Sequence, residues 1–347
     1  MTKRLSAQKF GVLYAYIHFA VEVACFFLLY NRFESGPLGV MYFLLFDALA
    51  FVPQSFLGIL NDKYPNLNIG LIGSVFMVLS FFVPINIISI VLLTLGNALL
   101  HVSGAQYTMH GADGKLGPLG TFVGAGSFGL VTGKLLGGAG YEWGMIIPVV
   151  LMLVAMVMTI VLPRYYEQVD DCHKFNAGAD KSAGFVILLA FIVVAIRSYV
   201  GYAIPTGWNK SNIQTIALFL FMGAGKIAGG FVADKIGYRK TAALSLGFSL
   251  PFLVFGDSIM WLSLIGVALF SMTMTLTVGV IASKIPRMPG LAFGITTVAL
   301  FLGVFPAFFI RPDTLIEHQL VSGILNIIAL ICLLMSIKSN SKKREGC

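Results

Sequence analysis

The sequence predicts an all-α membrane protein, with twelve transmembrane helices in two pseudo-symmetric six-helix bundles. Two observations lead to this fold class. The chain is 58% hydrophobic and only 11% charged, whereas soluble domains carry about 25% charged residues. In addition, the segment Gly58-Ile-Leu-Asn-Asp62-Lys63 returns half a chain length later as Gly230-Phe-Val-Ala-Asp234-Lys235. Such an offset indicates a tandem duplication.

Apolar segments of membrane-spanning length follow one another along the chain. A helix needs about 20 residues to cross a hydrocarbon core of about 30 Å. We predict spans over 10–30, 39–60, 69–84, 87–107, 119–140, 143–163, 184–204, 213–233, 241–256, 259–283, 289–310 and 319–337. Only short loops are left between them, so we expect no soluble catalytic domain and no cofactor.

The Lys and Arg residues of the loops predict the orientation through the positive-inside rule. With both termini in the cytoplasm, the inner segments hold Lys3, Arg4, Lys9, Lys63, Lys115, Arg164, Lys174, Lys181, Lys235, Arg239, Lys240, Lys284, Arg287, Lys338, Lys342, Lys343 and Arg344. The outer loops hold only Arg32, Lys210 and Arg311. We therefore expect a multi-pass protein in the bilayer of the cell membrane. The net charge of +8 is scattered over short loops, which argues against nucleic-acid binding.

The longest polar stretch lies at the midpoint of the chain. It covers residues 164–183 and contains Asp170-Asp171. We predict an N-terminal six-helix bundle over 1–163, a cytoplasmic linker over 164–183 and a C-terminal six-helix bundle over 184–347, in a monomer. A plain solvated loop explains the same polar residues equally well.

The second copy of the repeat resembles the signature loop of the major facilitator superfamily. It reads Gly230-x-x-x-Asp234-Lys235-x-Gly237-x-Arg239-Lys240, whereas the first copy continues as Tyr64-Pro65-Asn66. The resemblance implies gating roles, with each Asp held by basic residues and by a neighbouring helix N-terminus. The gating residues would be Gly58, Asp62, Gly230, Asp234, Lys235 and Arg239. Because the first copy is eroded, we expect the copies to contribute unequally; a structural turn that caps each helix is the alternative.

Further segments are similar to one branch of this superfamily, the fosmidomycin-resistance-type exporters. They are His18-Phe19-Ala20-Val21-Glu22, Gln54-x-x-x-Gly58-x-x-x-Asp62, Gly96-Asn97-Ala98-Leu99-Leu100-His101 and Arg197-Ser198-Tyr199-Val200-Gly201. In segment 119–140, the glycines at 120, 129, 133, 137 and 138 are similar to the antiporter motif, with Lys134 in place of its Pro. The resemblance implies export by proton antiport, although glycines at this spacing also serve helix packing.

Ionisable residues inside the predicted spans are the candidate coupling residues. Each costs about 2.5–3.5 kcal/mol at the centre of a span and is functional by default. His18 and Glu22 are four residues apart and share a helix face with Tyr14. We hypothesise that Glu22 and His18 couple transport to protons, together with Asp47 and His101. A fixed polar network that orients the first helix is the alternative.

The intramembrane cations point to the charge of the substrate. Lys134, Arg197 and Lys226 outnumber the carboxylates of Glu22 and Asp47. The planar fork of an Arg suits carboxylate or phosphonate groups, so an excess of cations favours an anionic substrate. We predict that the substrate contacts Arg197, Lys134, Tyr14, Asn97, Tyr199, Tyr202 and Lys226. The alternative is that each cation is simply neutralised by a salt bridge.

These features predict a secondary transporter that moves a small anionic organic solute by alternating access. Proton-coupled export is the preferred mode, and uptake by proton symport is its nearest alternative. A membrane-embedded enzyme, with His101 and Glu22 as acid and base, and a non-transporting receptor on the same fold are the other classes. Against an enzyme, the sequence has no metal-ligand spacing and no nucleophile elbow.

Overall fold

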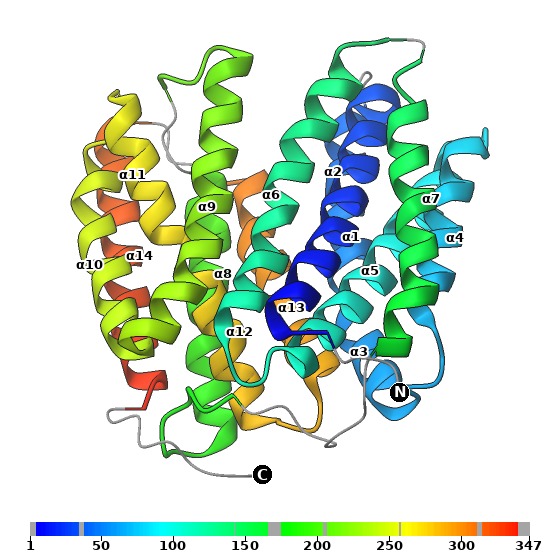
Figure 1. Cartoon of the computed structure of the whole chain (residues 1–347). Helices are drawn as coiled ribbons and strands as arrows, with labels where there is room; N and C mark the ends of the chain where they lie inside the picture. Colours follow the sequence, from blue (N-terminus) through cyan, green and yellow to red (C-terminus); the bar gives the residue numbers. More distant parts are fainter. Residues whose placement is uncertain are drawn as a thin grey trace.

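The computed structural model describes residues 5–34, 38–141, 143–165, 175–203, 207–256, 258–310 and 314–338, and these residues are almost entirely helical (Figure 1). The first half of the chain forms α1 (Ala7–Leu28, continued by a π-helical segment, Leu29–Phe33), α2 (Gly39–Phe51), α3 (Gln54–Lys63), α4 (Ile69–Phe82), α5 (Asn86–Gly111), α6 (Leu116–Gly138) and α7 (Ile146–Val161). The second half forms α8 (Ala183–Ala203), α9 (Asn212–Ile236), α10 (Tyr238–Val254), α11 (Met260–Ser271), α12 (Thr273–Lys284), α13 (Pro289–Val304, continued by a 3-10 segment, Phe305–Phe308) and α14 (Leu315–Ser336).

Each of the twelve predicted spans coincides with one helix or one interrupted pair of helices. The pair α2 and α3 is interrupted at Val52-Pro53, where the proline has no N–H for the helical ladder. The pair α11 and α12 is interrupted at Met272. Nine of these spans are long and apolar enough to cross a membrane, and α4 and α7 are shorter apolar helices, all counted over the described residues. The prediction of an almost entirely helical protein with helices at the twelve expected places is therefore confirmed, while α10 belongs to neither of these two groups.

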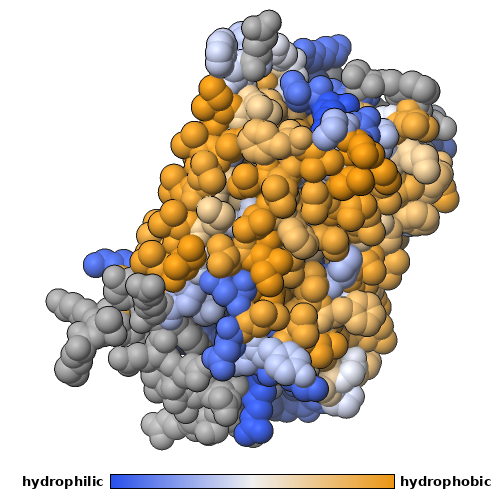
Figure 2. All heavy atoms as spheres, turned by 90° about the vertical axis from the view of Figure 1, so that its right-hand side faces the viewer, coloured by the Kyte–Doolittle hydropathy of each residue, from blue (hydrophilic) through white to orange (hydrophobic). Residues whose placement is uncertain are grey.

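A belt of apolar side chains covers the outer face formed by α4 and α7. Figure 2 shows a hydrophobic band with hydrophilic residues gathered above and below it. The exposed side chains of these helices include Ile72, Val75, Leu79, Ile146, Val150, Leu153, Val154 and Val157. An apolar surface of this extent marks contact with a membrane. The protein is thus a multi-pass membrane protein.

Several helices pack on others from the same half of the chain. In the first half, α1 contacts α5, α6 and α7, and α4 contacts α5 and α7. In the second half, α8 contacts α12, α13 and α14, and α10 contacts α11 and α14. The halves meet where α6 packs on α9 and where α3 packs on α13. In Figure 1, α1 begins and α14 ends at the same, lower end of the molecule.

Glycines of α6 bring its backbone close to two different helices. A Cβ on Gly133 would lie 2.5 Å from the carbonyl oxygen of Val23 in α1. A Cβ on Gly120 would lie 2.9 Å from the carbonyl oxygen of Lys226 in α9. Real Cβ atoms are not found this close to backbone, so larger residues would push these helices apart. Packing therefore explains the glycine spacing of this segment, and antiport stays a prediction.

Part of the predicted linker and several basic residues that predicted the orientation lie outside the described residues. These are residues 166–174, with Asp170 and Asp171, and Lys3, Arg4, Arg311, Lys342, Lys343 and Arg344. The described end of the linker contacts the end of α14. There the backbone N–H of Ala179 donates to the carbonyl of Ser336, at 2.8 Å, and Gly178 forms an isolated bridge with Ile337.

Candidate functional site

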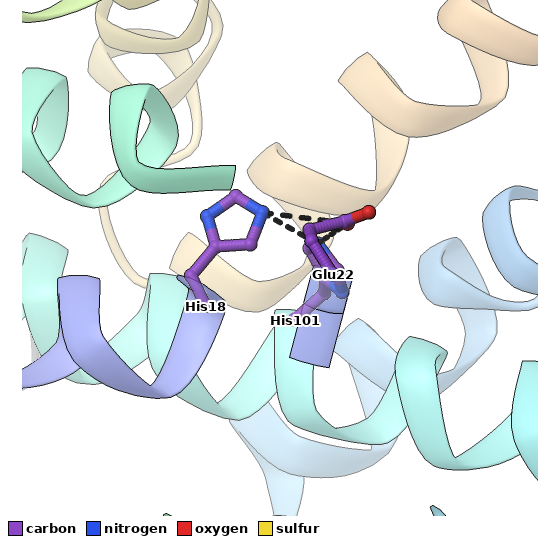
Figure 3. A group of neighbouring side chains, drawn as sticks. All are labelled: His18, Glu22 and His101. Carbon is purple, nitrogen blue, oxygen red and sulfur yellow. Dashed lines mark hydrogen bonds and ion pairs between the residues drawn. The ribbon is translucent and has the colours of Figure 1, made fainter. Parts of the chain in front are cut away.

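Two histidines and a glutamate meet between α1 and α5. His18 and Glu22 lie one turn apart on α1, and His101 comes from α5 (Figure 3). Glu22 Oε1 lies 3.1 Å from His101 Nε2 and 3.6 Å from His18 Nε2. The two Nε2 atoms are 2.8 Å apart. The side chains are 6–12% exposed, so the fold buries a carboxylate together with two imidazoles. We call this group the His–Glu–His cluster.

The opposite nitrogen of each imidazole is held by the backbone. His18 Nδ1 lies 2.8 Å from the carbonyl oxygen of Phe122 in α6, and His101 Nδ1 lies 2.9 Å from the carbonyl oxygen of Asn97. A carbonyl oxygen accepts hydrogen bonds and cannot donate them, so both Nδ1 atoms carry the hydrogen. A neutral imidazole in this tautomer directs the Nε2 lone pair into the cluster. The backbone thus fixes which atoms face Glu22.

The space for the cluster is provided by small residues of α6. A Cβ on Gly126 would overlap Nε2 of His18, and a Cβ on Gly129 would lie 2.8 Å from Cβ of Glu22. The ring of Phe122 packs against the ring of His18 at a centroid distance of 4.7 Å. The sequence analysis placed none of Gly126, Gly129 and Phe122 beside the cluster. Gly129 was named only as a member of the glycine pattern of this segment, and Gly126 and Phe122 were not named.

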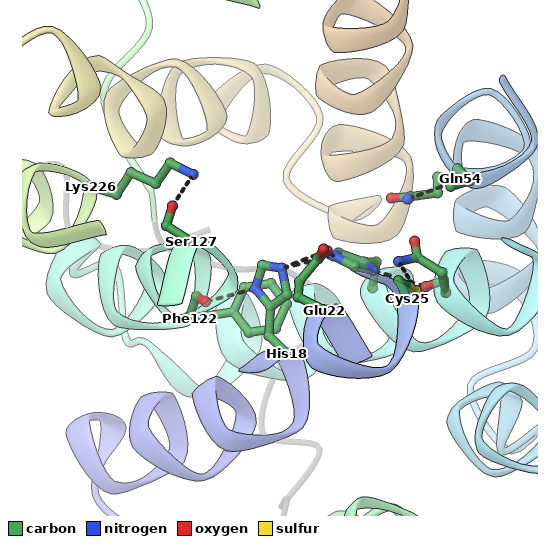
Figure 4. Close-up of polar contacts among 10 residues, drawn as sticks. His18, Glu22, Cys25, Gln54, Phe122, Ser127 and Lys226 are labelled. Atoms are coloured by element: carbon green, nitrogen blue, oxygen red, sulfur yellow. Dashed lines mark hydrogen bonds and ion pairs between the residues drawn. The ribbon is translucent and has the colours of Figure 1, made fainter. Parts of the chain in front are cut away.

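Arg197 of α8 and Lys226 of α9 bring positive charge to the interior of the molecule. Arg197 is only 9% exposed, and its Nε and Nη2 atoms have no hydrogen-bond partner among the described residues. The partly buried Lys226 donates from Nζ to Ser127 Oγ of α6 at 2.8 Å (Figure 4). The charge of Lys226 interacts with those of both Arg197 and Glu22. Neither cation is within 4 Å of a carboxylate in the described residues.

Three predicted site residues lie apart from this pair of cations. The ammonium of Lys134 lies over the ring of Tyr30, 5.0 Å from its centroid. Asp47 is partly buried and interacts electrostatically with Glu22, and it forms no ion pair with a cation in the described residues. The buried Asn97 donates from Nδ2 to Cys25 Sγ at 3.3 Å, and its Oδ1 has no hydrogen-bond partner in the described part of the chain.

The three predicted tyrosines have different environments. Tyr14 is 2% exposed and stacks between Phe10 and Tyr107, and its hydroxyl has no hydrogen-bond partner among the residues that the structure describes. It therefore belongs to the packed core of the first half. Tyr199 donates from its hydroxyl to the carbonyl oxygen of Ile310 at 3.4 Å. Tyr202 is 43% exposed and its ring packs against Phe308. Contacts of these tyrosines with a substrate stay a prediction.

The two aspartates of the repeated motif make the same type of contact with the opposite half. Asp62 accepts hydrogen bonds from the backbone N–H groups of Gly290 and Leu291, each at 2.9 Å, at the N-terminus of α13. Asp234 accepts hydrogen bonds from Leu116 and Gly117 at 2.7 and 2.8 Å, at the N-terminus of α6. A carboxylate at a helix N-terminus satisfies free N–H groups and is favoured by the helix dipole.

The two contacts are equivalent in geometry although the first copy is eroded, and the unequal contribution of the copies to gating stays a prediction. The contact needs only the carboxylate and a close glycine, and both copies have these. A Cβ on Gly58 would overlap the carbonyl of Gly290, and a Cβ on Gly230 would overlap the carbonyl of Leu116. The basic residues of the second copy lie outside the contact: Lys235 is exposed, and Arg239 donates to the carbonyl of Leu334 at 3.0 Å. Asp234 and Arg239 form no ion pair among the described residues, and a gating role of Arg239 stays a prediction.

Comparisons with known proteins identify the fold. No protein-family model matches the chain, and no curated protein matches it. Among solved structures, the chain is similar to the Escherichia coli fucose:proton symporter FucP, with a TM-score of 0.61, 11% identity, and 94% and 97% of the two chains covered. For a double tryptophan mutant of XylE, the TM-score is 0.62 and the sequence identity is 15%, with 97% of this chain and 96% of that chain covered. For a bacterial homologue of the iron transporter ferroportin, in its outward-facing state, the TM-score is 0.55 and the sequence identity is 13%, with 95% of this chain and 98% of that chain covered. The chain therefore has the fold of the major facilitator transporters.

Proposed function

We propose that this protein is a secondary transporter that binds a small organic anion at Arg197 and moves it across the membrane by alternating access. The observation that carries the proposal is the unpartnered Nε–Nη2 edge of Arg197 in a side chain only 9% exposed. A buried donor without a partner costs about 1–3 kcal/mol, and more when it is charged. A carboxylate or phosphonate satisfies both atoms of this edge at once through two parallel hydrogen bonds.

Lys226 supports an anionic substrate. Two cations whose charges repel each other lie in the interior, and the described residues provide neither with an ion pair. An anion that binds both removes this repulsion. Because α8 and Lys226 of α9 belong to the second half and Ser127 to the first, such an anion would lie where the halves meet, which is where substrates bind in this fold.

The test is ligand binding by purified protein. A thermal-shift screen of phosphonates and small carboxylates is followed by titration of the best ligand to wild type, Arg197→Gln and Lys210→Gln. The last variant removes an exposed cation of an outer loop. We expect Arg197→Gln to lose binding and Lys210→Gln to bind like wild type. Affinity of Arg197→Gln within a few-fold of wild type would place the anion elsewhere.

For coupling, the His–Glu–His cluster is the candidate cation site because three acceptor atoms converge in it. A proton is the coupling ion expected from the sequence, and export by antiport is the expected direction. The similar structures include a proton symporter and a homologue of an iron transporter, so they favour neither direction. Proteoliposomes with an imposed pH gradient test the coupling. Undiminished proton-driven flux in Glu22→Gln would contradict a role for this cluster.

For alternating access, we propose that residues 1–163 and 184–347 are two six-helix bundles that rock against each other, as a monomer in the cell membrane with both termini in the cytoplasm. The support is the pairing of α3 with α13 and of α6 with α9. The contacts of Asp62 and Asp234 would then form the cytoplasmic gate, closed in this structure. Labelling of single cysteines introduced at Lys63 and Lys210, from one side of intact cells, tests this orientation.

A further inference from the structure

Three acceptor atoms face one another in the His–Glu–His cluster. They are Nε2 of His18, Nε2 of His101 and Oε1 of Glu22, and they form a triangle with edges of 2.8, 3.1 and 3.6 Å. Each imidazole has its one N–H directed at a backbone carbonyl. The neutral rings therefore offer only lone pairs to the triangle, as does the carboxylate. Such an arrangement is stable only with a cation between the three atoms.

A proton satisfies this triangle incompletely. A single proton on His101 Nε2 forms a hydrogen bond with Glu22 Oε1. The lone pair of His18 Nε2 then still faces the carboxylate oxygen, which is an acceptor. Two protons, one on each imidazole, place two N–H groups 2.8 Å apart in the interior and add a second positive charge. A metal ion accepts all three lone pairs at a single point.

The dimensions of the triangle suit a first-row transition metal. Imidazole and carboxylate ligands lie about 2.0–2.2 Å from Zn²⁺. The three edges define a circle with a radius of about 1.9 Å, so a point just above the plane of the triangle lies about 2.05 Å from all three atoms. Two imidazoles and one carboxylate are a ligand set for zinc or iron, whereas Mg²⁺ and Ca²⁺ take oxygen ligands.

The surroundings of the cluster have the features of a metal site. Metal-bound histidines almost always direct the second ring nitrogen to a carbonyl or a carboxylate, as both histidines do here. A second, independent observation is the unpartnered Oδ1 of Asn97, a residue 1% exposed and one turn from His101. A buried acceptor that lacks a protein donor is commonly satisfied by a bound water molecule.

We infer that His18, Glu22 and His101 bind one divalent transition-metal ion, with a fourth position open to water or to a donor of a second ligand. The inference puts a metal ion in the cluster in place of the proton that the sequence predicts there. It does not depend on binding of the anion at Arg197.

The experiment uses purified, tag-free protein stripped with EDTA and titrated with Co²⁺, whose visible absorption reports ligand type and geometry. We expect one Co²⁺ per chain, displaced by Zn²⁺ and not by excess Mg²⁺. Glu22→Gln and His101→Gln should weaken Co²⁺ binding at least about tenfold and change the spectrum, since even indirect partners of a metal contribute that much. His318→Gln, on α14, is the matched control and should bind as wild type does.

Each variant is checked for folding by its thermal unfolding. If His101→Gln does not fold, the nearly isosteric Glu22→Gln keeps the inference testable. Co²⁺ binding by wild type that is absent, or no tighter than in Glu22→Gln, would overturn the inference and leave a proton as the occupant. Anion binding is measured separately in EDTA, so a chain that binds the anion and not Co²⁺ loses this inference and keeps the proposed function.

Discussion

The contact between Gly58 of α3 and Gly290 of α13 offers a sharp test of the closed lower end of the molecule. In Gly58→Ala the added Cβ would overlap the carbonyl group of Gly290, which is backbone and cannot rotate away. Overpacking of this kind costs about 1–3 kcal/mol. The penalty applies only while α3 and α13 are in contact, so it shifts the equilibrium toward separated helices by about 5- to 150-fold.

Amide hydrogen exchange measures this equilibrium between contacting and separated α3 and α13. The amides of Gly290 and Leu291 donate to Asp62 in the closed state and exchange when the contact opens. We expect their exchange in Gly58→Ala to accelerate by the same factor of about 5 to 150.

Gly247→Ala is the matched control, because a Cβ at this helical glycine of α10 meets nothing within 4 Å. Replacement of Gly by Ala stabilises either helix by about 1 kcal/mol through helix propensity. The difference between the two variants therefore reports only the contact between α3 and α13. Exchange at Gly290 and Leu291 that stays within about twofold of wild type in Gly58→Ala would refute the argument.

Three further predictions follow from particular contacts. Asp62→Asn and Asp234→Asn should each open their own helix contact to a similar degree, about 1.5–3 kcal/mol, because each loses a charged acceptor of two N–H groups; amide exchange at the two helix N-termini measures this, and a strong effect in only one variant would contradict the equivalence of the copies. Arg32→Ala should lower stability by about 2–4 kcal/mol, since its guanidinium donates to Asn86 Oδ1 and to the carbonyl of Val83, each at 2.8 Å; thermal unfolding without ligand measures this, with Lys210→Ala as an unchanged control. Gly237→Ala should destabilise by about 1–2 kcal/mol because φ at this residue is +89°; an unfolding midpoint equal to that of Gly247→Ala or higher would contradict the strain.

The sequence alone predicted the twelve helical spans because the length of an apolar segment and the polarity of the loops are local properties. A bilayer requires every backbone group inside it to be bonded within its own segment, so apolar runs of sufficient length become helices. The pairing of His18 with Glu22 was also readable, because residues four apart share a helix face. The repeat at Gly58 and Gly230 predicted equivalent positions in the two halves.

The tertiary structure decided which of these residues meet. His101 lies 83 positions from His18, and no spacing rule links them, so the third member of the cluster and its convergence with Glu22 come from the packing of α5 on α1. The same holds for Asp234, whose partners are on α6 and not among the basic residues that follow it in sequence. Periodicity along one helix identifies a face, but the helix that covers that face is chosen by packing over the whole chain.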